Sequence, residues 1–221
     1  MAISNNNTGI RTGVCTSSTR PTAPYEGQMI YETDTNRVLV YEGAAWVMIA
    51  DTDTPPGLQL IKTQTIGSGV TSVTMTDVFS SEFSSYKIVF SNLTFSSVDF
   101  MTMRLVVGST SNTTSNYYSS NLQVTTGGSV SGFGVSAGSY WNAGVVGFTA
   151  ASGGVIDIYN PQAAVATSFT SQGVDTRTDG APHRTGSGFF NASTQFDGFW
   201  ISTVNGGYTM GGTIRVYGYR N

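Results

Sequence analysis

Three short β-prone runs within residues 18–50 constrain the fold of this chain more than any other part of its sequence. Pro21 and Pro24 prevent a helix from starting there, because proline fixes φ and lacks an amide hydrogen. The β-prone runs are residues 28–31, 37–41 and 46–49. They are separated by the sequences ETDTN and EGAA, whose Asp, Asn and Gly residues favour turns. The stretch therefore predicts a three-stranded β-meander.

A meander of this size cannot enclose its own apolar side chains. Isolated hairpins are marginal in water, and chains below about 40 residues usually need disulfides, metals or oligomerisation. Cys15 is the only cysteine, so an internal disulfide is excluded, and no His or Cys cluster suggests a metal. We therefore expect burial against the downstream domain or against copies of the same segment. The residues expected at this assembly interface are Met29, Tyr31, Val38, Val40, Trp46 and Val47.

The same segment resembles a known module. The sequence RPTAPYEGQMIYETDT, followed by VLVY, Gly43 and AWV, is similar to a module of tailed-bacteriophage virion proteins of the tail-fibre, minor tail and head-decoration types. Residues 58–65 and the ending GGTIRVYGY resemble a small β-domain that often follows it. The resemblance implies a virion protein assembled in the host bacterial cytoplasm, most often as a homotrimer. Residues 1–50 would then contact other copies of the chain and other virion proteins.

A boundary follows the meander. Residues 51–57 read DTDTPPG, and a diproline favours an extended, semi-rigid spacer. Asp51 and Asp53 have no further oxygen ligands at the spacing of a calcium site, which favours a solvated linker. We therefore predict an arm and meander over residues 1–50, a Pro-rich linker over 51–57 and a separate domain over 58–221.

The downstream domain has an all-β pattern. Alternation over residues 100–107 assigns Arg104 to the outer face and the core face to Met101, Met103, Leu105 and Val107. Only residues 77–85 could hold a helical turn, whereas residues 108–121 and 174–188 are expected as long polar loops. About eight to ten strands with regular turn signals predict an antiparallel β-sandwich of jelly-roll type.

Charge and hydropathy exclude two classes of partner. Charged residues make up 10% of the chain and the net charge is −3, against roughly 25% charged residues in typical domains. No basic tract is present, so we expect no nucleic-acid binding. No run approaches the ~18 apolar residues that span a bilayer, so we expect no membrane insertion.

Enzymatic chemistry has weak support in the sequence. Ser136 lies in a G-x-S-x-G pattern, but the residues after it cannot start the helix that a nucleophile elbow requires. His183, the only histidine, is expected to be a solvated loop residue. Asp157, Asp175, Asp179 and Asp197 have no spacing that fixes a carboxylate pair, which leaves a glycan depolymerase as a remote alternative. We predict no enzyme activity, no cofactor and no metal.

Two aromatic clusters are the candidates for recognition. Tyr117 and Tyr118 lie in a Ser/Asn/Thr-rich stretch, and the second cluster is Tyr140, Trp141 and Asn142 beside glycines. Aromatic rings supply contact area at low entropic cost, and small polar groups adapt their hydrogen bonds. Our hypothesis is that these residues contact a host cell-surface glycan or protein. The alternative is that the rings fill the end of the sandwich or a trimer interface.

The leading functional expectation is a short trimeric tail-fibre or receptor-binding type protein. A capsid decoration or head-fibre protein is the alternative, in which the same architecture binds the phage shell. The two differ in what residues 1–50 contact, and the sequence does not reveal that partner.

Overall fold

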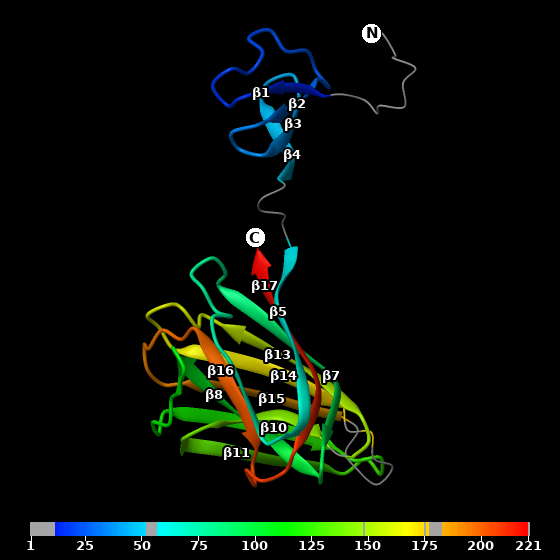
Figure 1. Ribbon diagram of the computed structural model, residues 1–221, viewed down its shortest axis with the longest axis vertical. Helices are drawn as coiled ribbons and strands as arrows, with labels where there is room; N and C mark the ends of the chain where they lie inside the picture. Colours follow the sequence, from blue (N-terminus) through cyan, green and yellow to red (C-terminus); the bar gives the residue numbers. More distant parts are fainter. Residues whose placement is uncertain (1–11, 52–56, 148, 175, 177–182, 221) are drawn as a thin grey trace. The chain divides into compact units, whose positions relative to one another are not determined.

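The computed structural model describes residues 12–51, 57–147, 149–174, 176 and 183–220. Every regular element among them is a β-strand, which confirms the predicted all-β class (Figure 1). The chain divides into two compact units, Met1–Pro56 and Gly57–Asn221. The division falls inside the segment predicted as a linker, of which residues 52–56 lie outside the described part of the chain.

The first unit is a small sheet with the strand order β1-β2-β3-β4. Its strands are β1 (Gly13–Cys15), β2 (Met29–Glu32), β3 (Arg37–Tyr41) and β4 (Trp46–Asp51). Strands β2, β3 and β4 pair antiparallel, so the predicted meander is confirmed. Strand β1 pairs parallel with β2 and was not predicted, because three residues in a polar segment give no periodicity.

The turns of the meander have the backbone conformations that their Asn and Gly residues favour. Asn36 adopts φ 52° and Gly43 adopts φ 87°, the left-handed region that Asn and Gly tolerate best. The Tyr31 hydroxyl donates to Asn36 Oδ1 at 2.8 Å. Asp34 accepts hydrogen bonds from the backbone amide of Ser17 at 2.9 Å and from its hydroxyl at 2.6 Å. The first turn is therefore tied to the segment that precedes β2.

Two buried carboxylates hold the first unit together. Glu32 is fully buried, and it accepts hydrogen bonds from Arg20 Nε and, at 2.7 Å, from the Thr35 hydroxyl. Asp51 is also buried and pairs with Arg37 Nε at 3.1 Å. The prediction of Asp51 as a solvated linker residue is therefore wrong, because this carboxylate ends β4 and has a cation opposite it.

The second unit consists of two antiparallel sheets. The eight-stranded sheet contains, in spatial order, β11 (Val130–Gly138), β10 (Tyr117–Val124), β15 (His183–Phe190), β14 (Thr167–Val174), β13 (Ser152–Tyr159), β7 (Ser85–Phe95), β17 (Met210–Arg220) and β5 (Gly57–Val70). The five-stranded sheet contains β12 (Trp141–Gly147), β8 (Asp99–Val107), β16 (Gly198–Thr203) and β6 (Ser72–Met75), with β9 (Thr110–Ser111) paired to β8.

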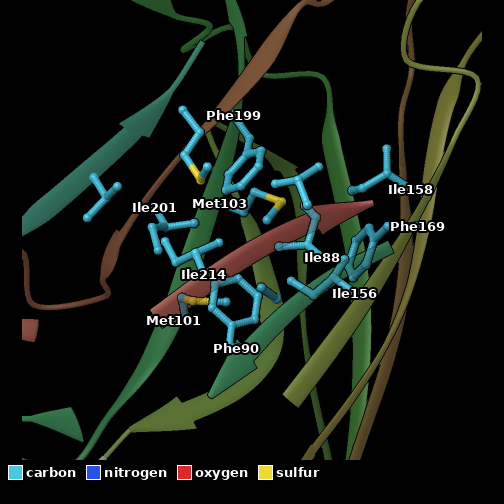
Figure 2. Close-up of a cluster of buried hydrophobic side chains, with 14 of the residues drawn as sticks. Ile88, Phe90, Met101, Met103, Ile156, Ile158, Phe169, Phe199, Ile201 and Ile214 are labelled. Atoms are coloured by element: carbon cyan, nitrogen blue, oxygen red, sulfur yellow. The ribbon is translucent and has the colours of Figure 1, made fainter. Parts of the chain in front are cut away.

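The core of this sandwich lies between the two sheets. Figure 2 shows Ile88, Phe90, Ile156, Ile158 and Ile214 of the larger sheet clustered with Met101, Met103, Phe199 and Ile201 of the smaller one. The predicted core face of residues 100–107 is confirmed for Met101, Met103 and Leu105, which are fully buried. Val107 is exposed instead, because it lies at the strand end beside the turn at Gly108.

Two predictions for the second unit are wrong. Residues 77–85 form no helical turn, although Phe79 and Phe83 are buried in the core. Residues 108–121 are not one loop, because β9 and the first half of β10 lie within them. Ser119 and Asn121 face inward on β10, opposite Gly188 and Gly186 of β15, and glycine leaves room for such buried polar groups.

Part of the second long loop prediction lies outside the described residues, at 175 and 177–182. Its last six residues, from His183 on, belong to β15 instead of a loop. The predicted β-sandwich is confirmed at the level of packed antiparallel sheets, and its jelly-roll connectivity stays a prediction.

Candidate functional site

Three of the five residues predicted for surface recognition are buried. Tyr117 and Trp141 are fully buried and pack edge to face with ring centroids 5.4 Å apart, and Asn142 is 7% exposed. The Tyr117 hydroxyl accepts from the Leu105 amide, and the Trp141 indole donates to a backbone carbonyl on β15, each at 3.0 Å. Burial raises the pKa of Tyr117 well above its usual range. The surface hypothesis is wrong for these three residues, which belong to the sandwich interior.

The other two predicted residues, Tyr118 and Tyr140, are half-buried. Tyr118 is on β10 of the eight-stranded sheet, and Tyr140 lies in the bend that precedes β12. Tyr118 stacks on Phe189 with ring centroids 5.0 Å apart and an interplanar angle of 7°. Tyr140 lines a separate pocket beside the five-stranded sheet. Each of the two aromatic clusters predicted from the sequence is therefore divided between the core and the surface. Each contributes one accessible ring, and the two rings lie in different places on the sandwich.

The outer face of the eight-stranded sheet carries a row of aromatic rings. Strand register places Tyr118 opposite Phe189, Phe189 opposite Ser168, and Ser168 opposite Tyr159. Alternate residues of a strand share a face, and the residues between these point into the core. Phe189 is 42% and Tyr159 is 37% exposed. Four adjacent strands thus present three rings and one hydroxyl in a line.

A second row, of hydroxyl groups, runs beside the first. Register places Ser120 opposite Ser187, Ser187 opposite Thr170, and Thr170 opposite Asp157. The Tyr159 hydroxyl lies 3.3 Å from Thr170 Oγ1, which links the two rows. A groove of about 600 Å³ follows this face, and its lining residues are Ser120, Asn121, Leu122, Gly132, Phe133, Gly134, Thr170, Thr185, Gly186 and Ser187.

The charged groups next to the groove neutralise one another. Lys87 Nζ lies 2.9 Å from Asp157 Oδ1, which also accepts a 2.8 Å hydrogen bond from the Tyr219 hydroxyl. Burial lowers the pKa of Lys87, but hydrogen bonds to Asp157 and Tyr219 outweigh it and leave the pKa raised. The groove therefore offers neutral hydroxyls for hydrogen bonding, and the aromatic row beside it offers rings for apolar contact.

The residues considered for catalysis do not form a site among the described residues. Ser136 lies inside β11 and the next element is strand β12, so the strand–turn–helix context of a nucleophile elbow is missing. His183 is exposed at the start of β15. Asp157 is paired with Lys87, and Asp197 Oδ2 accepts a hydrogen bond from the Gly108 amide at 2.7 Å. Asp175 and Asp179 lie outside the described residues.

Two other features are absent from the part of the chain that the structure describes. Within it, no group of three or more His, Cys, Asp or Glu side chains is placed to hold a metal ion. The same residues contain no helix with the length and apolar character needed to cross a bilayer.

Most residues predicted for assembly lie on one face of the first unit. Register places Met29 opposite Val40, Tyr31 opposite Val38, and Val40 opposite Val47. Met29 is 42% and Val47 is 38% exposed, and the other three are half-buried. We call these five residues the apolar face. Trp46 is on the opposite side, where its ring packs 5.4 Å from that of Tyr41.

The residues that complete these surfaces were not predicted from the sequence. Ser187 lies in the segment predicted as the second loop, and no pattern in the sequence linked Phe189 or Thr170 to Tyr118. The adjacent aromatic pairs Tyr117-Tyr118 and Phe189-Phe190 are the signal that could have identified them. Adjacent residues of a strand point to opposite faces, so each pair places one ring in the core and one on the outer face. Comparison with family models, with curated proteins and with solved structures gave no significant match.

Proposed function

We propose that this chain is a structural, non-enzymatic protein of a bacteriophage virion, in which the first unit assembles and the second contacts the host surface. The module resemblance of residues 18–50 supports the virion assignment. The observation that carries the assembly role is the apolar face, because a water-exposed sheet face of Met, Val and Tyr is typical of an interaction site.

The occupant we propose for the apolar face is the same face on two further copies of the chain. Ile30 and Leu39 are the only buried apolar side chains among the described residues of the first unit. Two such side chains supply too little core for a unit of this size, and a symmetric trimer would cover the exposed residues without any further partner.

For the second unit, we propose that the groove on the eight-stranded sheet contacts a glycan of the host surface. The groove volume of about 600 Å³ is within the usual range for ligand sites. Sugars present both hydroxyl groups and apolar C–H faces, which match the hydroxyl row and the aromatic row. Binding rather than catalysis fits the groove, since its charged neighbours, Lys87 and Asp157, are paired with each other.

Sedimentation of the purified chain tests the assembly role. We expect a species of three times the 23.3 kDa monomer mass. The variant Val47→Asp should dissociate it, because three buried carboxylates would face one another without a cation. The matched control is Val130→Asp, the same substitution at a more exposed valine on β11 of the second unit, which should leave the trimer intact. A stable wild-type monomer would refute the proposed assembly.

A further inference from the structure

A second pocket lies on the outer side of the five-stranded sheet. Its volume is about 220 Å³, and it lies between β6, β8 and β16. The lining residues are Thr71, Ser72, Thr102, Arg104, Tyr140, Trp200, Ser202, Thr203, Val204 and Gly206. Arg104 is the only charged residue among them, so the pocket has an uncompensated positive charge. Such a pocket favours an anion.

Arg104 is held in a fixed orientation. Its guanidinium carbon lies 4.5 Å from the centroid of the Trp200 ring, and register places the two residues opposite each other. Its Nε donates to the Ser139 carbonyl at 3.0 Å. The two terminal nitrogens make no hydrogen bond or ion pair with any described residue. They therefore form a pre-oriented planar fork, the geometry that binds a carboxylate through two parallel hydrogen bonds.

The hydroxyl groups around the fork divide into two sets. Ser202 Oγ donates to the Thr71 carbonyl at 2.9 Å, and Thr102 Oγ1 donates to the Ser202 carbonyl at 3.2 Å. Both hydroxyl hydrogens are thus committed within the protein. The side-chain hydroxyls of Tyr140, Thr71 and Ser72 have no such bond to the described residues and line the same pocket. They can donate to, or accept from, the hydroxyl groups of a ligand.

We propose that this pocket binds the carboxylate of an acidic sugar, such as a uronic acid. A single guanidinium matches a singly charged carboxylate better than a phosphate dianion, which one cation would leave half-compensated. The indole of Trp200 and the ring of Tyr140 add apolar surface for the sugar ring. The volume, below that of a drug-sized site, suits one sugar residue. This site lies on the opposite sheet from the groove and does not depend on the virion proposal.

Titration of the ¹⁵N-labelled full chain with glucuronate, followed by NMR, tests the site. We expect saturable shifts of the Arg104 Nε–H and Trp200 indole signals with a dissociation constant in the millimolar range, because one fork supplies the charge. Glucose, which has the same ring without the carboxylate, should give no saturable shift. Methyl phosphate and acetate should bind more weakly than glucuronate. Equal binding of glucose or acetate, or a preference for methyl phosphate, would overturn the proposal.

Variants assign the effect to the fork. Arg104→Gln should weaken glucuronate binding about tenfold or more, and Arg104→Lys, which keeps the charge but loses the fork, should weaken it less. Tyr140→Phe removes one hydroxyl only and should weaken binding without affecting the fold. Arg215→Gln is the matched control, since Arg215 is a half-buried arginine on β17 of the other sheet. Unchanged binding in both Arg104 variants, with the fold verified by NMR, would rule the site out.

Discussion

At the scale of single residues, the first unit depends on a buried anion. Glu32 has no exposed surface, yet it lies at a strand end and receives hydrogen bonds from Arg20 and from the Thr35 hydroxyl. The hydrogen bond from Arg20 outweighs the effect of burial, and the pKa of Glu32 is lowered. A carboxylate held in this way stabilises the fold only while it is ionised.

The lowered pKa gives a pH dependence with a defined sign. Since the folded-state pKa of Glu32 is below its unfolded value of about 4.3, the stabilisation is complete above that value. It is lost as the pH falls through the lower folded-state pKa. We expect the urea midpoint of the first unit, followed by NMR signals of β2 and β3, to fall steeply below about pH 4.3.

The matched variants isolate Glu32. Glu32→Gln should lower the stability of the first unit by about 1–3 kcal/mol at pH 7 and should remove most of the acid-induced loss. Glu42→Gln, at an exposed position, should retain the wild-type pH profile. The same profile in Glu32→Gln as in the wild type would show that another group is responsible.

At the scale of strands, glycines set the contact between β10 and β15. A Cβ added to Gly188 would lie 2.2 Å from the Tyr118 carbonyl oxygen and 2.6 Å from a ring carbon of Phe169. Neither neighbour can move freely, because one is backbone and the other is a core ring. The close approach of these strands therefore requires glycine at this position.

A single methyl group tests that requirement. Gly188→Ala should destabilise the second unit by about 1–3 kcal/mol, the usual cost of overpacking a core, as measured by the urea midpoint. Gly67→Ala on β5 is the control, because its added Cβ would meet no atom closer than 4.0 Å. Equal stability of both variants would contradict the packing described for β10 and β15.

The same strands show where sequence patterns succeed and fail. Alternation of large apolar residues predicted β8, because core burial leaves a strong signal when one face is apolar, and β-prone runs between turn residues predicted the meander. It failed for β10, where Ser119 and Asn121 occupy inward positions opposite glycines. The binding hypothesis failed at Tyr117 for the same reason. A segment interpreted as a loop gave no reason to separate its two adjacent tyrosines onto opposite faces.

At the scale of the whole molecule, the proposed assembly function and the proposed binding functions belong to different units. The apolar face belongs to the first unit, and the groove and the acidic-sugar pocket belong to the second. Under the proposed virion role, the partners of residues 1–50 would decide between a tail and a capsid location. The residues of the apolar face could be predicted because β2, β3 and β4 are consecutive in the sequence. The groove and the pocket could be found only from strand register, because strands far apart in the sequence form them.

Antibody labelling of virions from the encoding phage tests the location. We expect label at the tail, and virions with Tyr118→Ala and Phe189→Ala should adsorb to host cells about tenfold more slowly, because two stacked rings are lost from the groove face. Tyr25→Ala, which removes an exposed ring of the first unit, should adsorb normally. Label on the shell would instead support the capsid decoration alternative, and normal adsorption of the double variant would refute host contact by the aromatic row beside the groove.

The position of β17 has a consequence for biosynthesis. This strand lies between β7 and β5, and β5 has no other neighbour in its sheet. During translation, β5 and its exposed Leu58 and Leu60 leave the ribosome some 150 residues before the strand that pairs with them. The sandwich can close only after β17 emerges, because β17 is the strand that pairs with β5. In the interval, the backbone hydrogen-bonding groups of β5 have no strand partner and are open to chaperones or to aggregation.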